Sequence, residues 1–447
     1  MSTSPYPAYR AARSEWLDFI PAHWSEGTLR WLSKRYAGGT PDKTREDYWT
    51  DGTIPWLNSG SVNQGLIRVP SAFITEDAFA NSSARWVPAG ALVMALAGQG
   101  KTKGMVAQLG LPSTCNQSMA AIVPSAELEA RFLFWWLNSN YQNLRNMAGG
   151  DNRDGLNLEL LGNVGCPIPP LEEQAAIAAF LDRETSKIDA LVEAQRRLIE
   201  LLKEKRQAVI SHAVTKGLDP AAPMKDSGVE WLGQVPAHWE VKALKHVGEF
   251  NAGAGFPDAE QGLQFEELPF YKVNALALAD PDDFLTTGEN TVSRETAKRL
   301  GAYVFPADSI VFAKIGAALL LGRLRRLPAP ACLDNNMMGL TVHAGNDLEF
   351  VRSAMSLVKF DLISNPGTVP SLNKGQIANA VIAVPPLIEQ EAISIHLQQT
   401  AFRYRELSTQ ADAAISLLQE RRAALISAAV TGKIDVRGIA PEQAEAA

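Results

Sequence analysis

The chain has 447 residues, of which 46% are hydrophobic and 20% charged, and its formal net charge is −7 at pH 7. This length exceeds that of a typical single domain, and the composition is that of a globular protein. No stretch approaches the roughly 18 consecutive apolar residues of a membrane helix, and the first residues lack an apolar signal segment. We therefore expect a cytoplasmic protein with no membrane partner and with free thiols at Cys115, Cys166 and Cys332.

Two short sequence motifs, called words below, each occur twice. Residues 15–24 read EWLDFIPAHW, and residues 230–239 read EWLGQVPAHW. Residues 168–174 read IPPLEEQ, and residues 384–390 read VPPLIEQ. Both pairs share nearly the same offset, so each half of the chain is one complete unit. A repeat of this length is far above solenoid periods and predicts a duplicated pair of domains.

Within each half, a mixed segment precedes a helical one. Short apolar runs bounded by proline and glycine fill residues 14–167 and predict a globular α+β domain. After each Pro-Pro pair, apolar residues recur at alternating spacings of three and four, which predicts one long helix. The helix-packing positions are Ile177, Leu181, Ile188, Leu191, Leu198 and Leu202 in the first half, and Ile393, Leu397, Leu407 and Leu418 in the second.

A helix over residues 171–215 would be about 65 Å long. Two helices with such apolar stripes bury them most simply against each other. A pseudo-twofold relation between the halves would make the pair antiparallel, with the two domains separated by it. The open alternative is that each helix folds onto its own domain. The predicted boundaries are 1–168 for the first domain, 169–220 for the central helix, 221–384 for the second domain, 385–436 for the second helix and 437–447 for a disordered tail.

Between the repeated words, the sequences of the two predicted domains differ greatly. The two halves therefore share one framework but carry different sequences within it. In order and in duplication, these words resemble the DNA-specificity subunit of type I restriction-modification systems. The resemblance covers nearly the whole chain and includes the repeated words above, GGTP at 38–41, IPW at 54–56, GFP at 255–257, PFYKV at 269–273, and the pairs Asn116-Gln117 and Asn335-Asn336.

The resemblance implies two target-recognition domains that each read half of a split site in double-stranded DNA, with the helices acting as a ruler. It also implies that the helices dock two adenine methyltransferase subunits, and that restriction and motor subunits can join. The chain itself would have no catalytic site and no cofactor, whereas S-adenosylmethionine, ATP and Mg²⁺ would belong to the partner subunits.

The acidic net charge argues against a broad basic footprint, and neither domain is basic as a whole. Positive charge is clustered instead. We interpret Lys101, Lys103, Lys314, Arg323, Arg325 and Arg326 as local phosphate contacts, with a solvated surface as the alternative for each cluster.

Amides and guanidinium groups suit base edges, because Asn and Gln pair with adenine and Arg with guanine. For each such residue, a turn or capping role is the alternative. The predicted DNA-reading residues, together with a lysine beside them, are Asn58, Ser59, Asn116, Gln117, Arg153, Lys272, Asn274, Asn335 and Asn336.

Two enzymatic interpretations fail on the residues. ALAGQGKT at 95–102 satisfies a relaxed phosphate-loop pattern, but Pro112 soon follows and the second half lacks the Gly-Lys-Thr, so we expect a turn between strands. The Asn-Pro-Pro-aromatic word of an adenine methyltransferase is missing. No metal-ligand spacing or nucleophile motif appears either. The remaining alternative is a coiled-coil adaptor whose two domains bind proteins.

Overall fold

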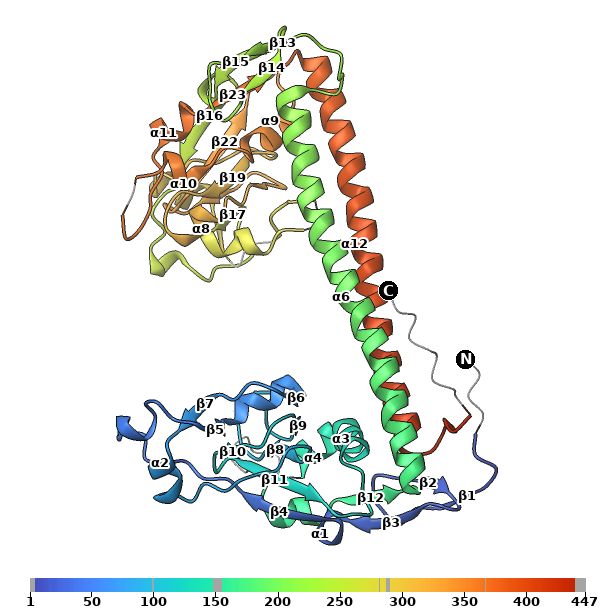
Figure 1. The fold of residues 1–447 in the computed structure, drawn as a ribbon. Helices are drawn as coiled ribbons and strands as arrows, with labels where there is room; N and C mark the ends of the chain where they lie inside the picture. Colours follow the sequence, from blue (N-terminus) through green and yellow to red (C-terminus); the bar gives the residue numbers. More distant parts are fainter. Residues whose placement is uncertain are drawn as a thin grey trace. The chain divides into compact units, whose positions relative to one another are not determined.

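The computed structural model describes residues 5–98, 100–147, 155–280, 282–286, 290–365 and 367–438. It divides into two compact units, one of residues 1–196 with 412–447 and one of residues 197–411. The division crosses two long helices, α6 (Leu171–Lys216) and α12 (Leu387–Val430), which Figure 1 shows as continuous. Each unit therefore contains one globular domain and one end of each long helix. The domain boundaries expected from the sequence stay a prediction.

The first unit is built on a five-stranded sheet in the order β4-β11-β8-β9-β6, beside a three-stranded sheet in the order β10-β5-β7. Two further antiparallel pairs, β1-β2 and β12-β3, lie where the chain enters and leaves the domain. The strands are β1 (Tyr9–Ala11), β2 (Phe19–Pro21), β3 (Ser25–Thr28), β4 (Ser33–Ala37), β5 (Ile54–Leu57), β6 (Leu66–Ile67), β7 (Ala72–Ile74), β8 (Leu92–Ala95), β9 (Val106–Leu109), β10 (Thr114–Cys115), β11 (Met119–Pro124) and β12 (Gly165–Ile168). The helices are α1 (Leu29–Leu32), α2 (Glu76–Ala80), α3 (Ala130–Ser139), α4 (Tyr141–Asn146) and α5 (Leu158–Gly162).

The second unit repeats this plan with a four-stranded sheet in the order β16-β22-β19-β20 and a three-stranded sheet in the order β18-β17-β21. Its strands are β13 (Met224–Asp226), β14 (Gln234–Pro236), β15 (Glu240–Ala243), β16 (Gly248–Ala252), β17 (Leu268–Tyr271), β18 (Thr291–Val292), β19 (Ile310–Ala313), β20 (Arg325–Arg326), β21 (Cys332–Leu333), β22 (Met337–Val342) and β23 (Val381–Val384). Its helices are α7 (Arg294–Arg299), α8 (Ala317–Leu320), α9 (Leu348–Met355), α10 (Phe360–Ile363) and α11 (Lys374–Ala378). The α+β class predicted from the sequence is thus confirmed.

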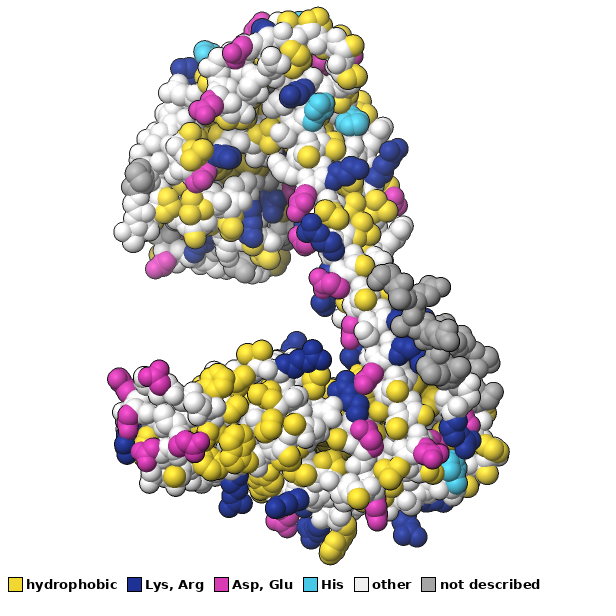
Figure 2. All heavy atoms as spheres, viewed as in Figure 1, with side chains coloured by type: hydrophobic (Ala, Val, Ile, Leu, Met, Phe, Trp, Pro, Cys, Tyr) yellow, Lys and Arg dark blue, Asp and Glu magenta, His cyan; other side chains and the backbone are white. Residues whose placement is uncertain are grey.

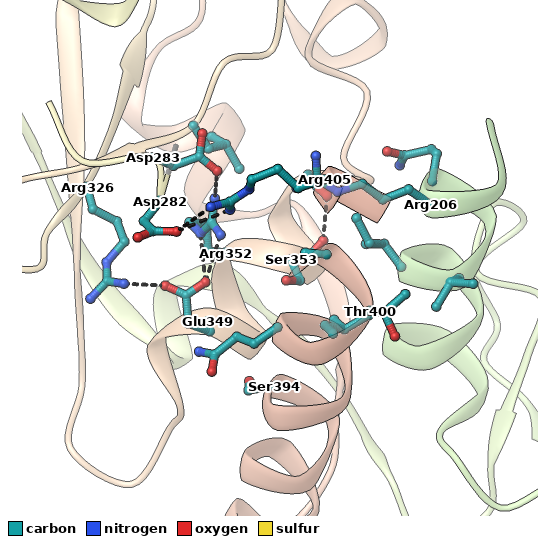
Figure 3. Close-up of a pocket in the computed structure, with 18 of the residues that line it drawn as sticks. Arg206, Asp282, Asp283, Arg326, Glu349, Arg352, Ser353, Ser394, Thr400 and Arg405 are labelled. Carbon is teal, nitrogen blue, oxygen red and sulfur yellow. Dashed lines mark hydrogen bonds and ion pairs between the residues drawn. The ribbon is translucent and has the colours of Figure 1, made fainter. Parts of the chain in front are cut away.

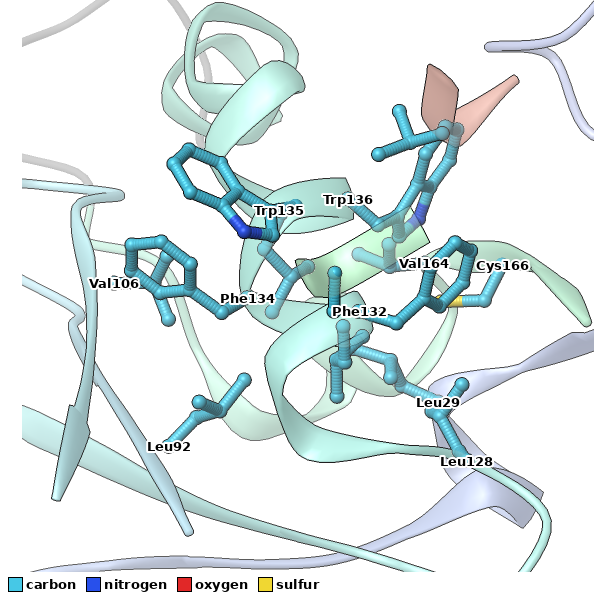
Figure 4. Close-up of a cluster of buried hydrophobic side chains, with 14 of the residues drawn as sticks. Leu29, Leu92, Val106, Leu128, Phe132, Phe134, Trp135, Trp136, Val164 and Cys166 are labelled. Carbon is cyan, nitrogen blue, oxygen red and sulfur yellow. The ribbon is translucent and has the colours of Figure 1, made fainter. Parts of the chain in front are cut away.

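The core of the first unit forms where α3 packs on the central sheet (Figure 4). The α3 side chains Phe132 and Trp136 are fully buried there, with Leu92 of β8 and Cys166 of β12. Burial of an aromatic side chain stabilises a fold by several kcal/mol, so Phe132 and Trp136 fix α3 firmly against the rest of this core. The second unit uses Phe350 of α9 in the same way.

The two repeated words meet in space at the start of each long helix. In the first unit, the Trp24 indole Nε1 donates to Glu173 Oε1 at 3.0 Å, and His23 Nε2 lies 2.9 Å from Glu173 Oε2. In the second unit, the Trp239 indole Nε1 donates to Glu389 Oε1 at 3.0 Å, and His238 Nε2 lies 2.8 Å from Glu389 Oε2. The repeated tryptophans and glutamates therefore join each domain to its helix, which explains why the words are the same in both halves.

The long helices pack antiparallel within each unit. In the first unit, Ile177 and Leu181 near the start of α6 share a core with Ile426 and Val430 near the end of α12. In the second unit, Ala213 and Val214 near the end of α6 share a core with Ile393 and Leu397 near the start of α12. The expected antiparallel pairing is confirmed, and the alternative of two separately folded helices is wrong.

The predicted apolar stripe is buried only toward its ends. Ile188 is buried, and Leu202 and Leu418 are half-buried. Leu191, Leu198 and Leu407 are exposed, at 52%, 41% and 45%. The helix-packing role of these three side chains therefore stays a prediction, because about half of each side chain is accessible in this chain. A heptad pattern alone does not show which partner covers each apolar position.

All three cysteines are buried and free, as expected. Among the described residues, no helix combines the length and the hydropathy that spanning a membrane requires.

Candidate nucleic-acid interface

Two parallel strands of the first domain end side by side and present predicted DNA-reading residues at one edge. β5 pairs with β10 so that Leu57 lies opposite Cys115, and the Asn116 N–H donates to the Leu57 carbonyl at 2.9 Å. Parallel strands place the residues after their carboxyl ends at the same edge, and in open sheets such edges carry binding sites. Asn58 and Asn116 therefore follow the strands at neighbouring positions, with Ser59 and Gln117 next to them.

A glycine-rich segment lies behind this edge. The Gly39 N–H donates to the Cys115 carbonyl at 2.8 Å, and the Thr40 hydroxyl donates to Gln117 Oε1. A Cβ atom on Gly38 would collide with the carbonyl oxygens of Cys115 and Asn116. Only glycine lets the backbone approach this closely, so the GGTP word is required by packing. Sequence reasoning missed Thr40 as part of the site, although its word was recognised.

The second domain builds the same edge from different residues. β17 and β21 pair in parallel with Tyr271 opposite Leu333, and the Asp334 N–H donates to the Tyr271 carbonyl at 2.9 Å. A Cβ atom on Gly253 would collide with the Asp334 carbonyl, as one on Gly38 would with that of Cys115. The framework is thus duplicated while the side chains at the edge change.

This geometry corrects the predicted alignment of the two edges. Asn116 Oδ1 accepts from the Ser118 N–H at 3.1 Å, and Asp334 Oδ1 accepts from the Asn336 N–H at 2.9 Å. Asn116 is therefore equivalent to Asp334, and Gln117 is equivalent to Asn335. The sequence had aligned the pair Asn116-Gln117 with Asn335-Asn336, one position away. The turn role considered for Asn116 accounts for its Oδ1.

Asp334 is a buried carboxyl group at this edge, with 6% of its surface exposed. Burial disfavours the charged form and raises the pKa of Asp334, against the lowering effect of the backbone N–H groups of Asn336 and Val273 and of the Lys272 charge. The amide in the equivalent position of the first domain carries no such cost.

The other predicted readers lie at these edges with mixed roles. Asn58 is exposed, and its Oδ1 caps a 3₁₀ helix by accepting from the Gly60 N–H at 2.8 Å. Lys272 Nζ donates to Gln261 Oε1 at 2.9 Å. Asn274 and Asn335 are exposed. Arg153 lies outside the described residues.

The lysines predicted to contact phosphate differ in their exposure. Lys101 is exposed in the connection between β8 and β9, and Lys314 follows β19, with its N–H donating to the Asn336 carbonyl at 2.9 Å. Lys103 is buried, with 6% exposed, which does not fit the expected surface phosphate contact.

The described part of the 95–102 segment lies between two antiparallel strands, so the turn expected there is confirmed.

The arginine cluster of the second domain lies away from this edge, beside α9 and the long helices. Arg325 pairs with Asp283, and Arg326 pairs with Glu349 at 2.7 Å and with Asp308 at 2.5 Å. These guanidinium charges are already compensated within the chain. The prediction that Arg325 and Arg326 bind phosphate therefore lacks support from the geometry, and Arg323 is the exposed member of the cluster.

The visible surface is electrostatically mixed. Figure 2 shows basic and acidic side chains interspersed over the chain, with no broad basic area on the face drawn. Within the described residues, no group of three or more His, Cys, Asp or Glu side chains is arranged to hold a metal ion. The arrangement at the two edges suits recognition by hydrogen bonds more than attraction by charge alone.

Comparisons with known proteins agree with this organisation. The family described as the type I restriction modification DNA specificity domain matches twice, over residues 21–201 and 236–415. The EcoR124I/EcoR124II specificity subunit of Escherichia coli is 26% identical over 43% of this chain and 48% of its own length. The chain thus spans about half the length of that relative. The StySPI specificity subunit of Salmonella potsdam is 22% identical over 93% of this chain and 90% of its own length.

A solved chain from work on complex assembly and conformational transition of the type I R-M system has the same fold. The TM-score is 0.73 at 16% identity, covering 93% of this chain and 99% of the other. The family match covers most of the sequence and falls once on each half of the repeat. The chain belongs to the family of type I restriction-modification DNA specificity domains.

Proposed function

We propose that this chain is the noncatalytic specificity subunit of a type I restriction-modification complex, and that it reads an asymmetric, bipartite target in double-stranded DNA. The observation that carries the proposal is the duplicated edge. Gly38 and Gly253 support the same backbone arrangement, while Asn58 and Asn116 in one domain are replaced by Lys272 and Asp334 in the other. One framework with two different sets of polar groups suits two different half-sites.

The long helices serve as the ruler and the docking surface in this proposal. Leu191 of the first unit and Leu198 and Leu407 of the second are exposed on them and are the apolar side chains that a docked partner would cover. We assign the exposed faces of the helices to two adenine methyltransferase subunits, with optional restriction and motor subunits. The catalysis and the cofactors S-adenosylmethionine, ATP and Mg²⁺ then belong to those partners, and the complex works in the cytoplasm.

The test is to coexpress the chain with its methyltransferase partner, purify the complex and map adenine methylation on host DNA by single-molecule sequencing. One split motif with a fixed gap is the expected result. A stable complex that methylates no defined motif would contradict the specificity role. It would favour the protein-binding adaptor instead.

A domain exchange tests the independence of the two readers. Replacing residues 221–384 by the corresponding segment of another family member should change one half of the methylated motif and leave the other half and the gap intact. Loss of both halves would contradict separate recognition by the two domains.

A further inference from the structure

The second unit contains a pocket that the DNA-reading edge does not use. Its volume is about 770 Å³, and it lies between α9, the last turns of α6, the first half of α12 and the segment 322–326 (Figure 3). Arg206, Arg323, Ser353, Gln398 and Phe402 are among its lining residues. This volume is within the range of small-ligand sites, roughly 300–1,000 Å³.

The internal repeat identifies what occupies the equivalent place in the first unit. The Glu129 N–H donates to Gln174 Oε1 at 2.7 Å, and the Asp347 N–H donates to Gln390 Oε1 at 2.9 Å. Glu129 and Asp347 are also the N-cap residues of α3 and α9. Counting six residues on from each cap makes Trp135 of α3 equivalent to Ser353 of α9.

In the first unit, Trp135 fills the space between α3 and the long helices. Its indole Nε1 donates to Asp182 Oδ1 at 2.9 Å. The guanidinium groups of Arg131 and Arg422 lie 5.2 and 5.8 Å from its ring centroid. Arg422 is further paired with Asp189 at 2.9 Å. The Trp135 indole is therefore hydrogen-bonded to a carboxylate, and Arg422 contacts both the indole ring and a carboxylate.

In the second unit, every partner of that arginine is replaced. The offset between the repeated helix starts makes Gln398 equivalent to Asp182, Arg405 equivalent to Asp189 and Arg206 equivalent to Arg422. With Ser353 in place of Trp135, Arg206 faces neither a ring nor a carboxylate at these positions. No hydrogen bond or ion pair joins Arg206 or Arg323 to another residue within the described ranges. Two guanidinium groups thus line a cavity where an indole is missing.

The acidic groups of the pocket do not neutralise these two arginines. Asp283 pairs with Arg325 and with Arg352, the latter at 2.6 Å, and Glu349 pairs with Arg326 and Arg352, both at 2.7 Å. Figure 3 shows this network on one wall of the pocket, with Arg206 reaching in from α6 on the other side. The pocket therefore keeps a net positive charge and an unfilled volume.

We infer that this pocket binds a nucleotide, whose planar base takes the place of the Trp135 indole against Arg206 and whose phosphate is bound by Arg206 and Arg323. Arginine both stacks on flat rings and binds phosphate through paired N–H groups. A pocket of this volume fits a free small molecule better than a duplex, whose backbone needs an extended groove. This site is separate from the proposed DNA-reading edges, so its failure would leave the proposed function standing.

The experiment measures binding of AMP, ATP and inorganic phosphate to the full-length chain by isothermal titration calorimetry. We expect AMP or ATP to bind more tightly than phosphate. Arg206→Gln should weaken nucleotide binding at least about tenfold, because a charge-assisted contact is lost. Ser353→Trp should abolish binding by rebuilding the indole of the first unit.

The matched control is Arg422→Gln, which removes the equivalent guanidinium where Trp135 already fills the space. Its nucleotide affinity should equal that of the unchanged chain. Because Arg206 is exposed, Arg206→Gln keeps the test decisive even where Ser353→Trp fails to fold. The inference is overturned by no nucleotide binding, by equal affinity for phosphate and AMP, or by Arg206→Gln weakening duplex DNA binding alone.

Discussion

Trp24 and Glu173 are 149 residues apart in sequence, yet the indole Nε1 of the first donates a 3.0 Å hydrogen bond to the carboxylate of the second. The same carboxylate also accepts a hydrogen bond from the Tyr6 hydroxyl. Burial of that hydroxyl, together with its hydrogen bond to Glu173, raises the pKa of Tyr6 above its usual value. In the second unit, Trp239 and Glu389 repeat the bond, but residues 221 and 222, near the position equivalent to Tyr6, are alanines. The joint between domain and helix therefore has one more hydrogen bond in the first unit than in the second.

Replacing Glu173 by alanine should reduce the free energy of unfolding by about 2 kcal/mol, because it leaves a buried indole N–H and a hydroxyl without their acceptor. Glu389→Ala should cost less, since the Glu389 side chain is 30% exposed and that of Glu173 only 4%. Thermal unfolding of the full chain measures both. The exposed neighbour Glu172→Ala is the control, and equal losses for Glu173→Ala and Glu389→Ala would contradict the asymmetry.

Lys101 and Lys103 should differ in their effect on DNA binding. Each phosphate contact contributes about 0.9 to the slope of log affinity against log salt concentration. Lys101→Gln should lower that slope by about one contact, because its side chain is exposed. Lys103→Gln should leave the slope unchanged, because Lys103 is buried. Titrations of the methyltransferase complex with duplex DNA at several salt concentrations measure both slopes, and a smaller slope for Lys103→Gln would contradict this placement.

Asp334 should make the second unit less stable as the pH rises. Its folded-state pKa is raised by burial, so the folded chain holds this proton to a higher pH than the unfolded chain, whose carboxyl titrates at about 4. Stability is therefore lost as the pH rises above that value. Asp334→Asn keeps the acceptor for the Asn336 N–H and should stabilise the chain at pH 7 by on the order of 1 kcal/mol.

The reciprocal variant Asn116→Asp places a carboxyl group in the first domain and serves as the matched comparison. It should add a loss of stability at neutral pH that is absent at pH 3. Urea denaturation at pH 3, 5 and 7 measures both variants. An Asp334→Asn chain that loses stability at pH 7 would count against the cost assigned to the buried carboxylate.

Shortening both long helices by one heptad, between Leu191 and Leu202 in α6 and over the antiparallel stretch of α12, should shorten the gap in the recognised motif. Seven residues span about 10 Å of helix, which corresponds to about 3 base pairs. Methylation mapping reads the new gap directly. Replacing the same heptads by others of equal length is the control, and an unchanged gap in the shortened chain would rule out the ruler.

Sequence alone predicted the architecture because the repeat made it visible. The words around Trp24 and Trp239 recur at one offset, and apolar spacing identified α6 and α12. The individual apolar positions were less predictable. Leu181 is buried and Leu191 exposed, although both fit the heptad, because burial depends on where the partner helix and the domain contact α6.

The candidate site was predicted by residue type but not by register. The alignment of Asn116 with Asn335 followed the letters, whereas the backbone pairing makes Asp334 the equivalent residue. Arg325 looked like a phosphate contact because its partner, Asp283, is far away in sequence. The pocket at Ser353 was invisible to sequence reasoning, because it depends on which side chain is missing between three elements.

Two of the three buried thiols, Cys115 and Cys332, lie beside the candidate edges, one in each domain. Cys115 lies directly before Asn116 and Cys332 directly before Leu333, so both are part of the strands that end at the candidate edges. Burial raises the pKa of Cys115 to about 12 and that of Cys332 to about 11, which keeps both thiols protonated and unreactive in the closed fold. A thiol reagent can label them only when the strand opens. Labelling rates of Cys115 and Cys332, measured separately from that of Cys166 with and without target DNA, would therefore report which of the two edges is held closed by DNA.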